Sequence, residues 1–169
     1  MLPNDISVGS VQVADDGFHP RFDAVSRLYQ YRLFCQPLRD PIQERFMWRV
    51  WPLVNGDRLV EVAQQLLGTH DFSAFGSPTA PKGTTVRTVI KAEWMQTAEN
   101  EWQFEVQANA FLYRMVRRMV FLQVAVAQGK ISVDAISGSL AKQEAAESRS
   151  GLPSGLAPAH GLTLINVEY

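Results

Sequence analysis

The segment of residues 111–128 limits the folds open to this sequence more than any other segment does. Its apolar side chains recur with the 3.6-residue period of an α-helix and fall within one arc: Leu112, Met115, Val116, Met119, Leu122 and Val126. Gln123 is the one polar residue on that arc. A helix with so wide an apolar stripe must pack on another layer of secondary structure, so we expect a layered domain.

Alternating segments on both sides of this helix predict the strands on which it packs. Residues 27–34 place Tyr29, Tyr31 and Leu33 on one face of a half-buried strand. Similar patterns predict further strands at residues 46–51, 88–95, 102–108 and 162–167, with a turn at 97–101. Hairpin strands interleaved with packing helices indicate an α+β fold with one antiparallel sheet.

Two more helices are expected on this sheet. Residues 57–67 carry one apolar helical face, formed by Leu59, Val62, Ala63 and Leu66. Gly68 follows as a stop signal, and a further helix is expected at residues 132–145. Pro, Gly and Ser gather at residues 76–85 and 148–158, so both segments are predicted loops.

The composition fits one domain over residues 1–169, because 46% hydrophobic residues suffice for a packed core. No apolar run approaches the roughly 20 residues that span a bilayer, and no signal-peptide pattern is present, so a cytoplasmic protein is expected. Cys35 is the single cysteine, and the three histidines lack metal-ligand spacing. We therefore expect neither a disulfide nor a metal site, and the sequence carries no nucleophile elbow or Gly-rich phosphate loop.

The net charge of −1 conceals a bias toward arginine, which supplies 12 of the 16 basic residues. Arginine is suited to bidentate phosphate contacts and to stacking on bases. Arg114, Arg117 and Arg118 lie opposite the apolar arc, and no acidic residue occurs in residues 111–128. A solvated helix face is the plainer explanation of such residues, but their clustering favours a patch for phosphates or for a carboxylate.

Five segments, taken in order, resemble the TruA-type tRNA pseudouridine synthase family over nearly the whole chain. They are Leu2-Pro3-x-Asp5-Ile6 with Phe18-His19-x-Arg21-Phe22, Arg27-x-Tyr29-x-Tyr31, Gly68-x-His70-Asp71-Phe72-x-x-Phe75, Ala108-Asn109-Ala110-Phe111-Leu112-Tyr113-x-Met115-Val116-Arg117, and Gly161-Leu162-x-Leu164. Their common order and spacing make the match specific, most of all in residues 109–117. The resemblance implies the C-terminal domain of the pseudouridine synthase fold.

The resemblance also implies a reaction, the isomerisation of uridine to pseudouridine at positions 38 to 40 of the tRNA anticodon stem-loop. In the family an Asp attacks the nucleotide, the glycosidic bond breaks, and the uracil turns and is rejoined through carbon. The target uridine must leave the base stack. No cofactor or metal is implied, tRNA is the implied partner, and the complete protein is expected to be a homodimer.

Three residues match the family's site position by position. The resemblance implies that Tyr29 lies against the uracil and takes the C5 proton, that Arg117 pairs with the catalytic Asp, and that Leu162 packs on the other face of the uracil. From the pattern alone, Tyr29 and Leu162 are core residues of strands, and Arg117 is a solvated residue of a helix. Contacts to the tRNA backbone are expected from Arg21, Arg27, Arg114 and Arg118.

His70-Asp71 has the appearance of an acid-base pair, but a local role is more economical. Asp71 is expected to cap the turn after the helix, while Phe72 and Phe75 fill the core. Taken one at a time, Arg21 and Arg27 are also explained as ordinary surface groups.

The sequence departs from the family at the nucleophile. The family's Asp lies in an Arg-Thr-Asp-Ala-Gly sequence, whereas Arg87-Thr88 is followed here by Val89. We expect the Asp to lie in an N-terminal half outside this chain, which would then be inert alone. Residues 2–8 read as a continuation of upstream sequence; if translation begins at Met1, a non-catalytic RNA-binding or assembly module is the alternative.

Overall fold

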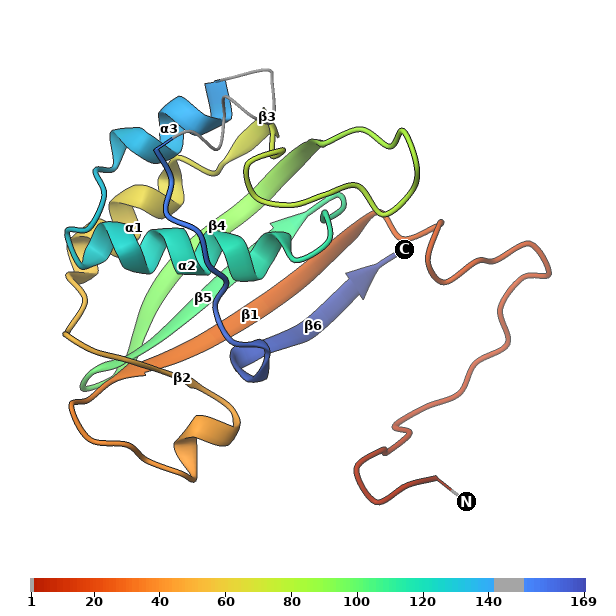
Figure 1. The fold of residues 1–169 in the computed structure, drawn as a ribbon. Coiled ribbons are helices and arrows are strands. Elements are labelled where there is room, and N and C mark those ends of the chain that lie inside the picture. Colours follow the sequence, from red (N-terminus) through yellow and green to blue (C-terminus); the bar gives the residue numbers. More distant parts are fainter. Residues whose placement is uncertain (1, 142–150) are drawn as a thin grey trace.

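The computed structural model describes residues 2–141 and 151–169. The elements are β1 (Ser26–Cys35), β2 (Trp48–Val50), α1 (Gly56–Gln64), β3 (Gly68–Asp71), β4 (Val86–Ala98), β5 (Glu101–Ala108), α2 (Met115–Ala127), α3 (Asp134–Ala141) and β6 (Leu162–Glu168). The strands form one sheet in the order β2-β1-β5-β4-β3, and β6 pairs with β1 (Figure 1). The expected α+β fold is confirmed.

The sheet is antiparallel except at one edge. β1 pairs antiparallel with β5 and β6, whereas β2 runs parallel to the end of β1, with Leu33 opposite Trp48. The pattern of residues 46–51 predicted a strand but not its direction. The connection 36–47 carries the chain back to a point beside Leu33, and β2 then runs in the same direction as the last residues of β1.

One face of the sheet carries the core. Alternate residues of β1, β4 and β5 join side chains of all three helices in one buried cluster that includes Leu33, Phe104 and Met119. α2 crosses this face, and residues 151–158, which we call the strap, pass over its outer side (Figure 1). Because the sheet covers one side of α2 and the strap the other, ten of its residues are buried. Gln123 is among them, and its side chain accepts a 2.8 Å hydrogen bond from Trp94 Nε1.

The start of α2 and the strand β3 depart most from the sequence expectations. α2 begins at Met115 rather than at Phe111, because Tyr113 N donates to Ser77 O and Arg114 adopts a left-handed backbone with φ of 65°. β3 was not predicted, since its four residues do not alternate in polarity. The end of the helix expected at residues 132–145 lies outside the described residues.

Local hydrogen bonds shape the chain around α1 and β3. The Asn55 side chain accepts a hydrogen bond from Arg58 N at the start of α1. The Asp71 carboxylate accepts one from Ser73 N at 2.9 Å, while Phe72 and Phe75 are buried. His70 Nε2 lies 2.7 Å from Leu67 O, which gives this histidine a local hydrogen bond.

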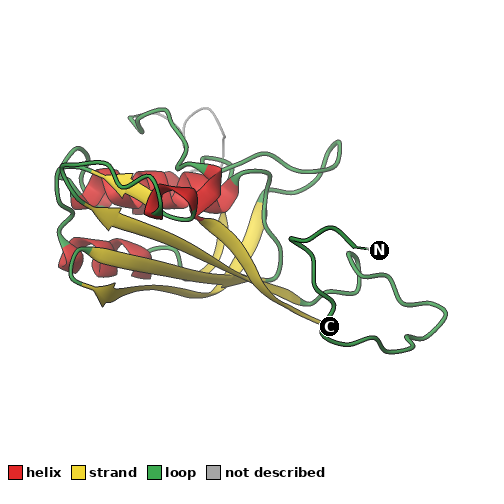
Figure 2. Cartoon of the chain, turned by 90° about the horizontal axis from the view of Figure 1, so that it is seen from below, coloured by secondary structure: helices red, strands yellow, loops and turns green. Residues whose placement is uncertain are grey.

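The N-terminal stretch up to β1 is a loop that projects from the end of the sheet where the C-terminus also lies (Figure 2). Among the described residues, no helix is long and apolar enough to cross a membrane. The same residues contain no group of three potential metal ligands.

Candidate active site

A small pocket brings together the three residues that the motifs singled out. Tyr29 from β1, Leu162 from the start of β6 and Arg117 from the first turn of α2 all line it. The remaining lining residues come from the chain just before and at the start of α2: Phe111, Leu112, Arg114, Met115 and Val116. These residues are far apart in the sequence and meet because α2 crosses over β1.

Two of the walls are an aromatic ring and an aliphatic side chain. Tyr29 is half-buried, and its ring meets that of Phe111 edge to face with centroids 5.1 Å apart. Leu162 is also half-buried. It lies close to Tyr29 because its backbone pairs with Tyr31, two residues along β1. Such a pair of apolar walls suits a flat ring.

Gly161 allows the start of β6 to approach β1. A Cβ atom at Gly161 would lie 2.7 Å from Tyr31 Cζ and 2.9 Å from Arg32 O, distances that are too short for a side chain. The Tyr31 hydroxyl donates to Pro158 O at 2.7 Å on the same side. The position of Leu162 is therefore fixed by close backbone packing rather than by its own side chain.

Arg117 supplies the positive charge, and the strap orients it. Its Nε donates to Ala157 O at 2.7 Å, and Ala157 N donates back to Arg117 O at 3.1 Å. Burial raises the pKa of Tyr31 above its ordinary value, and the nearby charge of Arg117 opposes that rise. Within residues 2–141 and 151–169, Arg117 has no ion-pair partner, and no carboxylate lines the pocket.

The four arginines that the sequence singled out for contacts to the tRNA backbone occupy different environments. Arg114 is exposed and lines the pocket directly. Arg118 Nη1 donates to Pro153 O at 2.6 Å and to Gly155 O at 3.0 Å, so it fastens the strap. These positions leave Arg114, which immediately precedes α2, as the arginine best placed to meet a ligand at the mouth of the pocket.

Arg21, which precedes the sheet, and Arg27, at the start of β1, also differ from each other. Arg27 Nη1 donates to the carbonyls of Ala24 and Asn109 at 2.8 Å, which ties the start of β1 to the turn before α2. Arg21 is exposed on the N-terminal stretch, with its guanidinium 5.7 Å from the ring centroid of Phe22.

The pocket volume is about 90 Å³. Sites for small molecules usually measure roughly 300–1,000 Å³, so this pocket is smaller than a usual ligand site. An aromatic ring, an aliphatic wall and an unpaired guanidinium can hold a flat neutral base and a carboxylate supplied by another segment.

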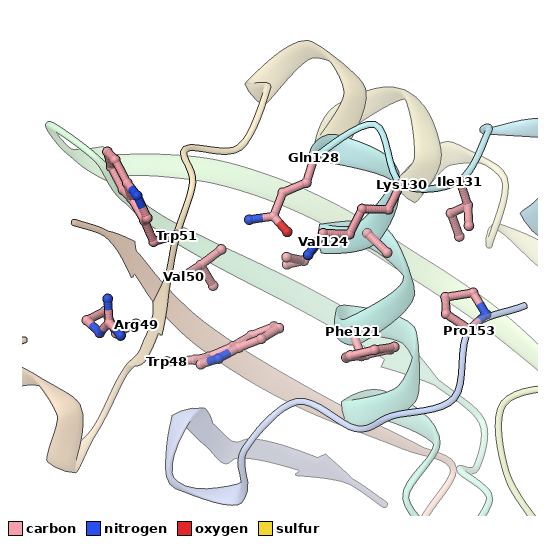
Figure 3. A pocket seen from close by; sticks show the side chains of 11 residues that line it. Trp48, Arg49, Val50, Trp51, Phe121, Val124, Gln128, Lys130, Ile131 and Pro153 are labelled. Atoms are coloured by element: carbon pink, nitrogen blue, oxygen red, sulfur yellow. The ribbon is translucent and has the colours of Figure 1, made fainter. Parts of the chain in front are cut away.

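A separate pocket of about 310 Å³ lies between β2 and the C-terminal half of α2 (Figure 3). Trp48, Trp51 and Phe121 line it. Arg49 of β2 also lines it, but its Nε already forms an ion pair with Glu44 Oε1 at 3.5 Å. None of the residues singled out from the sequence lines this pocket. The candidate active site is therefore assigned to the pocket at Tyr29.

Sequence reasoning missed two parts of the site. Phe111 lies inside the most specific motif, and its place there was a usable signal for a contact with Tyr29. No sequence signal pointed to the strap, because its backbone carbonyls accept hydrogen bonds from Arg117 and Arg118, which lie more than thirty positions away.

Comparison with known proteins agrees with this geometry. A family model described as tRNA pseudouridine synthase matches residues 62–169. The tRNA pseudouridine synthase A of Bacillus subtilis is 35% identical over 170 residues, which cover 100% of this chain and 66% of that protein. The enzyme of the same name from Thermoanaerobacter sp. is 32% identical over 100% of this chain and 67% of its own length. The chain thus spans about 66% of the first of these relatives.

Proposed function

The chain belongs to the tRNA pseudouridine synthase family, and from that premise we propose that it forms one wall of the active site of such an enzyme. The complete protein would convert uridine to pseudouridine at positions 38 to 40 of the tRNA anticodon stem-loop. The observation that carries this proposal is that Tyr29, Arg117 and Leu162 line one pocket that contains no carboxylate among the described residues.

In this proposal each residue has one task. The flipped uracil lies between the Tyr29 ring and Leu162, and Tyr29 accepts the proton that leaves C5. Arg117 faces the catalytic Asp and keeps it ionised and oriented, as a guanidinium beside a carboxylate does. The Asp comes from sequence outside this chain and attacks the nucleotide, and the glycosidic bond to N1 of the uracil breaks. The Asp leaves again when the uracil is rejoined through C5.

The tRNA would lie across the mouth of the pocket, where Arg114 is exposed. Arg21 on the N-terminal stretch extends the same contact. Arg27 and Arg118 are bonded to backbone carbonyls and contribute their charge while they shape the surface. We also propose that the complete protein is a homodimer and works in the cytoplasm, in keeping with the resemblance described above.

Binding of RNA tests the proposed surface. Residues 1–169 should bind a fluorescein-labelled anticodon stem-loop with a Kd of roughly 10⁻⁴ to 10⁻⁶ M, and more weakly as salt rises. Arg114→Glu should raise the Kd and reduce the salt dependence measured by fluorescence anisotropy. Arg58→Glu is the matched control, because Arg58 is exposed on α1 and does not line the pocket.

If both charge reversals change the Kd equally, the RNA is held by net charge alone and not at this pocket. If neither charge reversal changes the Kd, Arg114 is a solvated surface residue, and the proposed tRNA contact is wrong.

A further inference from the structure

Another pocket, which we call the second pocket and which is distinct from the one at Trp48 and Phe121, adjoins the candidate active site. It has a volume of about 410 Å³ and lies between residues 74–77, the start of α2 and the strap. Arg114 lines both pockets, so the two pockets adjoin at this residue. The second pocket falls within the usual size of small-ligand sites, and no acidic residue lines it.

An exposed aromatic ring stands in this pocket on a fixed backbone. The Tyr113 side chain is 56% exposed although Tyr113 N donates to Ser77 O at 2.9 Å. Gly76 lets the two segments meet, since a Cβ there would lie only 2.7 Å from Tyr113 O. The Arg114 guanidinium lies 4.7 Å from the centroid of the Tyr113 ring. Together they form a flat cationic and aromatic surface that is held in place but not covered.

The electrostatic setting of Arg114 favours an anion in the same place. Arg114 immediately precedes α2, and the first turn of that helix has no acidic residue to offset the cation. Within the described residues Arg114 forms no ion pair. A phosphate between the two pockets would supply the missing negative charge.

We propose that the second pocket is a subsite for the nucleotide next to the target uridine. The phosphodiester that joins the two nucleotides contacts Arg114, and the neighbouring base stacks on Tyr113. Every base presents a flat face, so this subsite contributes affinity and register without selecting a sequence. The inference rests on the proposed function, because it takes the Tyr29 pocket as the place of the target uracil.

Photocrosslinking of residues 1–169 tests the arrangement. Anticodon stem-loop RNAs carry 5-bromouridine either at the target position or at one of its two neighbours, and mass spectrometry locates each adduct. We expect the target base to crosslink to Tyr29 and one neighbour to crosslink to Tyr113. If the target adduct forms on Tyr29 but no neighbour reaches Tyr113, the subsite is wrong and the proposed function stands. If the target base does not reach Tyr29, the proposed function itself loses its site.

Two substitutions at one position separate stacking from folding. Tyr113→Ala should raise the Kd for the stem-loop about tenfold, in line with the usual loss of one base-aromatic stack. Tyr113→Phe keeps the ring and should leave the Kd within about twofold. Equal Kd values for the wild type and Tyr113→Ala, with both proteins folded by circular dichroism, would overturn the proposal.

Discussion

At the scale of single residues, Tyr31 links the core of the sheet to the candidate site. Its ring is fully buried in β1, and its hydroxyl donates to Pro158 O at the end of the strap. Two residues along the same strand, Tyr29 lines the pocket. On the same face of β1, Tyr31 is therefore a structural anchor and Tyr29 is a wall of the site.

Tyr31→Phe should lower the free energy of unfolding by about 1 kcal/mol at neutral pH, because Pro158 O loses its donor. Burial raises the pKa of Tyr31, so the folded protein holds the phenol proton more tightly than the unfolded chain does. The wild type therefore loses this stability as the pH rises above the unfolded value of about 10. Urea unfolding at pH values on both sides of 10 should show the difference between the two proteins closing. A difference that stays constant would contradict the role of the hydroxyl.

At the scale of elements, the strap holds the site together without being a helix or a strand. Arg117 and Arg118 bind its carbonyls, and Gly155 lets it approach α2 because a Cβ there would overlap the Phe121 ring. The backbone of Gly155 has φ of 143°, which side chains rarely adopt.

Gly155→Ala should lower the free energy of unfolding by about 2 kcal/mol, since it adds both backbone strain and a clash with Phe121. Gly151→Ala is the matched control: φ is 82° there, but nothing lies within 4 Å of the added carbon. It should cost about 1 kcal/mol, from the backbone alone. Equal losses in chemical denaturation would show that the strap does not pack on Phe121 as described.

Periodicity predicted the elements that carry a continuous apolar face. It failed where backbone contacts between distant segments determine where an element begins or whether it forms. The strands β1 and β5 and the core of α1 follow from their patterns. The start of α2 does not, because the bond from Tyr113 N to Ser77 O turns the chain before the helix begins. β3 likewise depends on its pairing with β4 rather than on its own residues.

The candidate site followed from motifs and not from patterns. Tyr29 and Leu162 look like ordinary strand residues until they are considered with the block at residues 109–117. The roles of Arg27 and Arg118 were not predictable, because the carbonyls that they bind are brought to them only by the tertiary fold.

At the scale of the whole molecule, the chain is a packed sheet with helices on one face and the candidate site at one end. The pocket is small, holds a guanidinium without an ion-pair partner in the described residues, and lies in a chain that spans about 66% of its Bacillus subtilis relative. In the proposed function, another segment of the complete protein completes this site, which accounts for the small pocket and for the guanidinium.

Release of tritium from tRNA labelled at C5 of uracil measures this sharing directly. Residues 1–169 alone should release none above background, whereas the complete protein encoded by the reading frame should release it. Arg117→Ala should lower the rate of the complete protein by roughly a hundredfold or more, as the loss of one preorganised electrostatic contact does. In residues 1–169 the same change should lower the free energy of unfolding by only about 1 kcal/mol, since the guanidinium donates to one backbone carbonyl there. Tyr29-dependent release by residues 1–169 alone, or no release by the complete protein, would contradict the shared site.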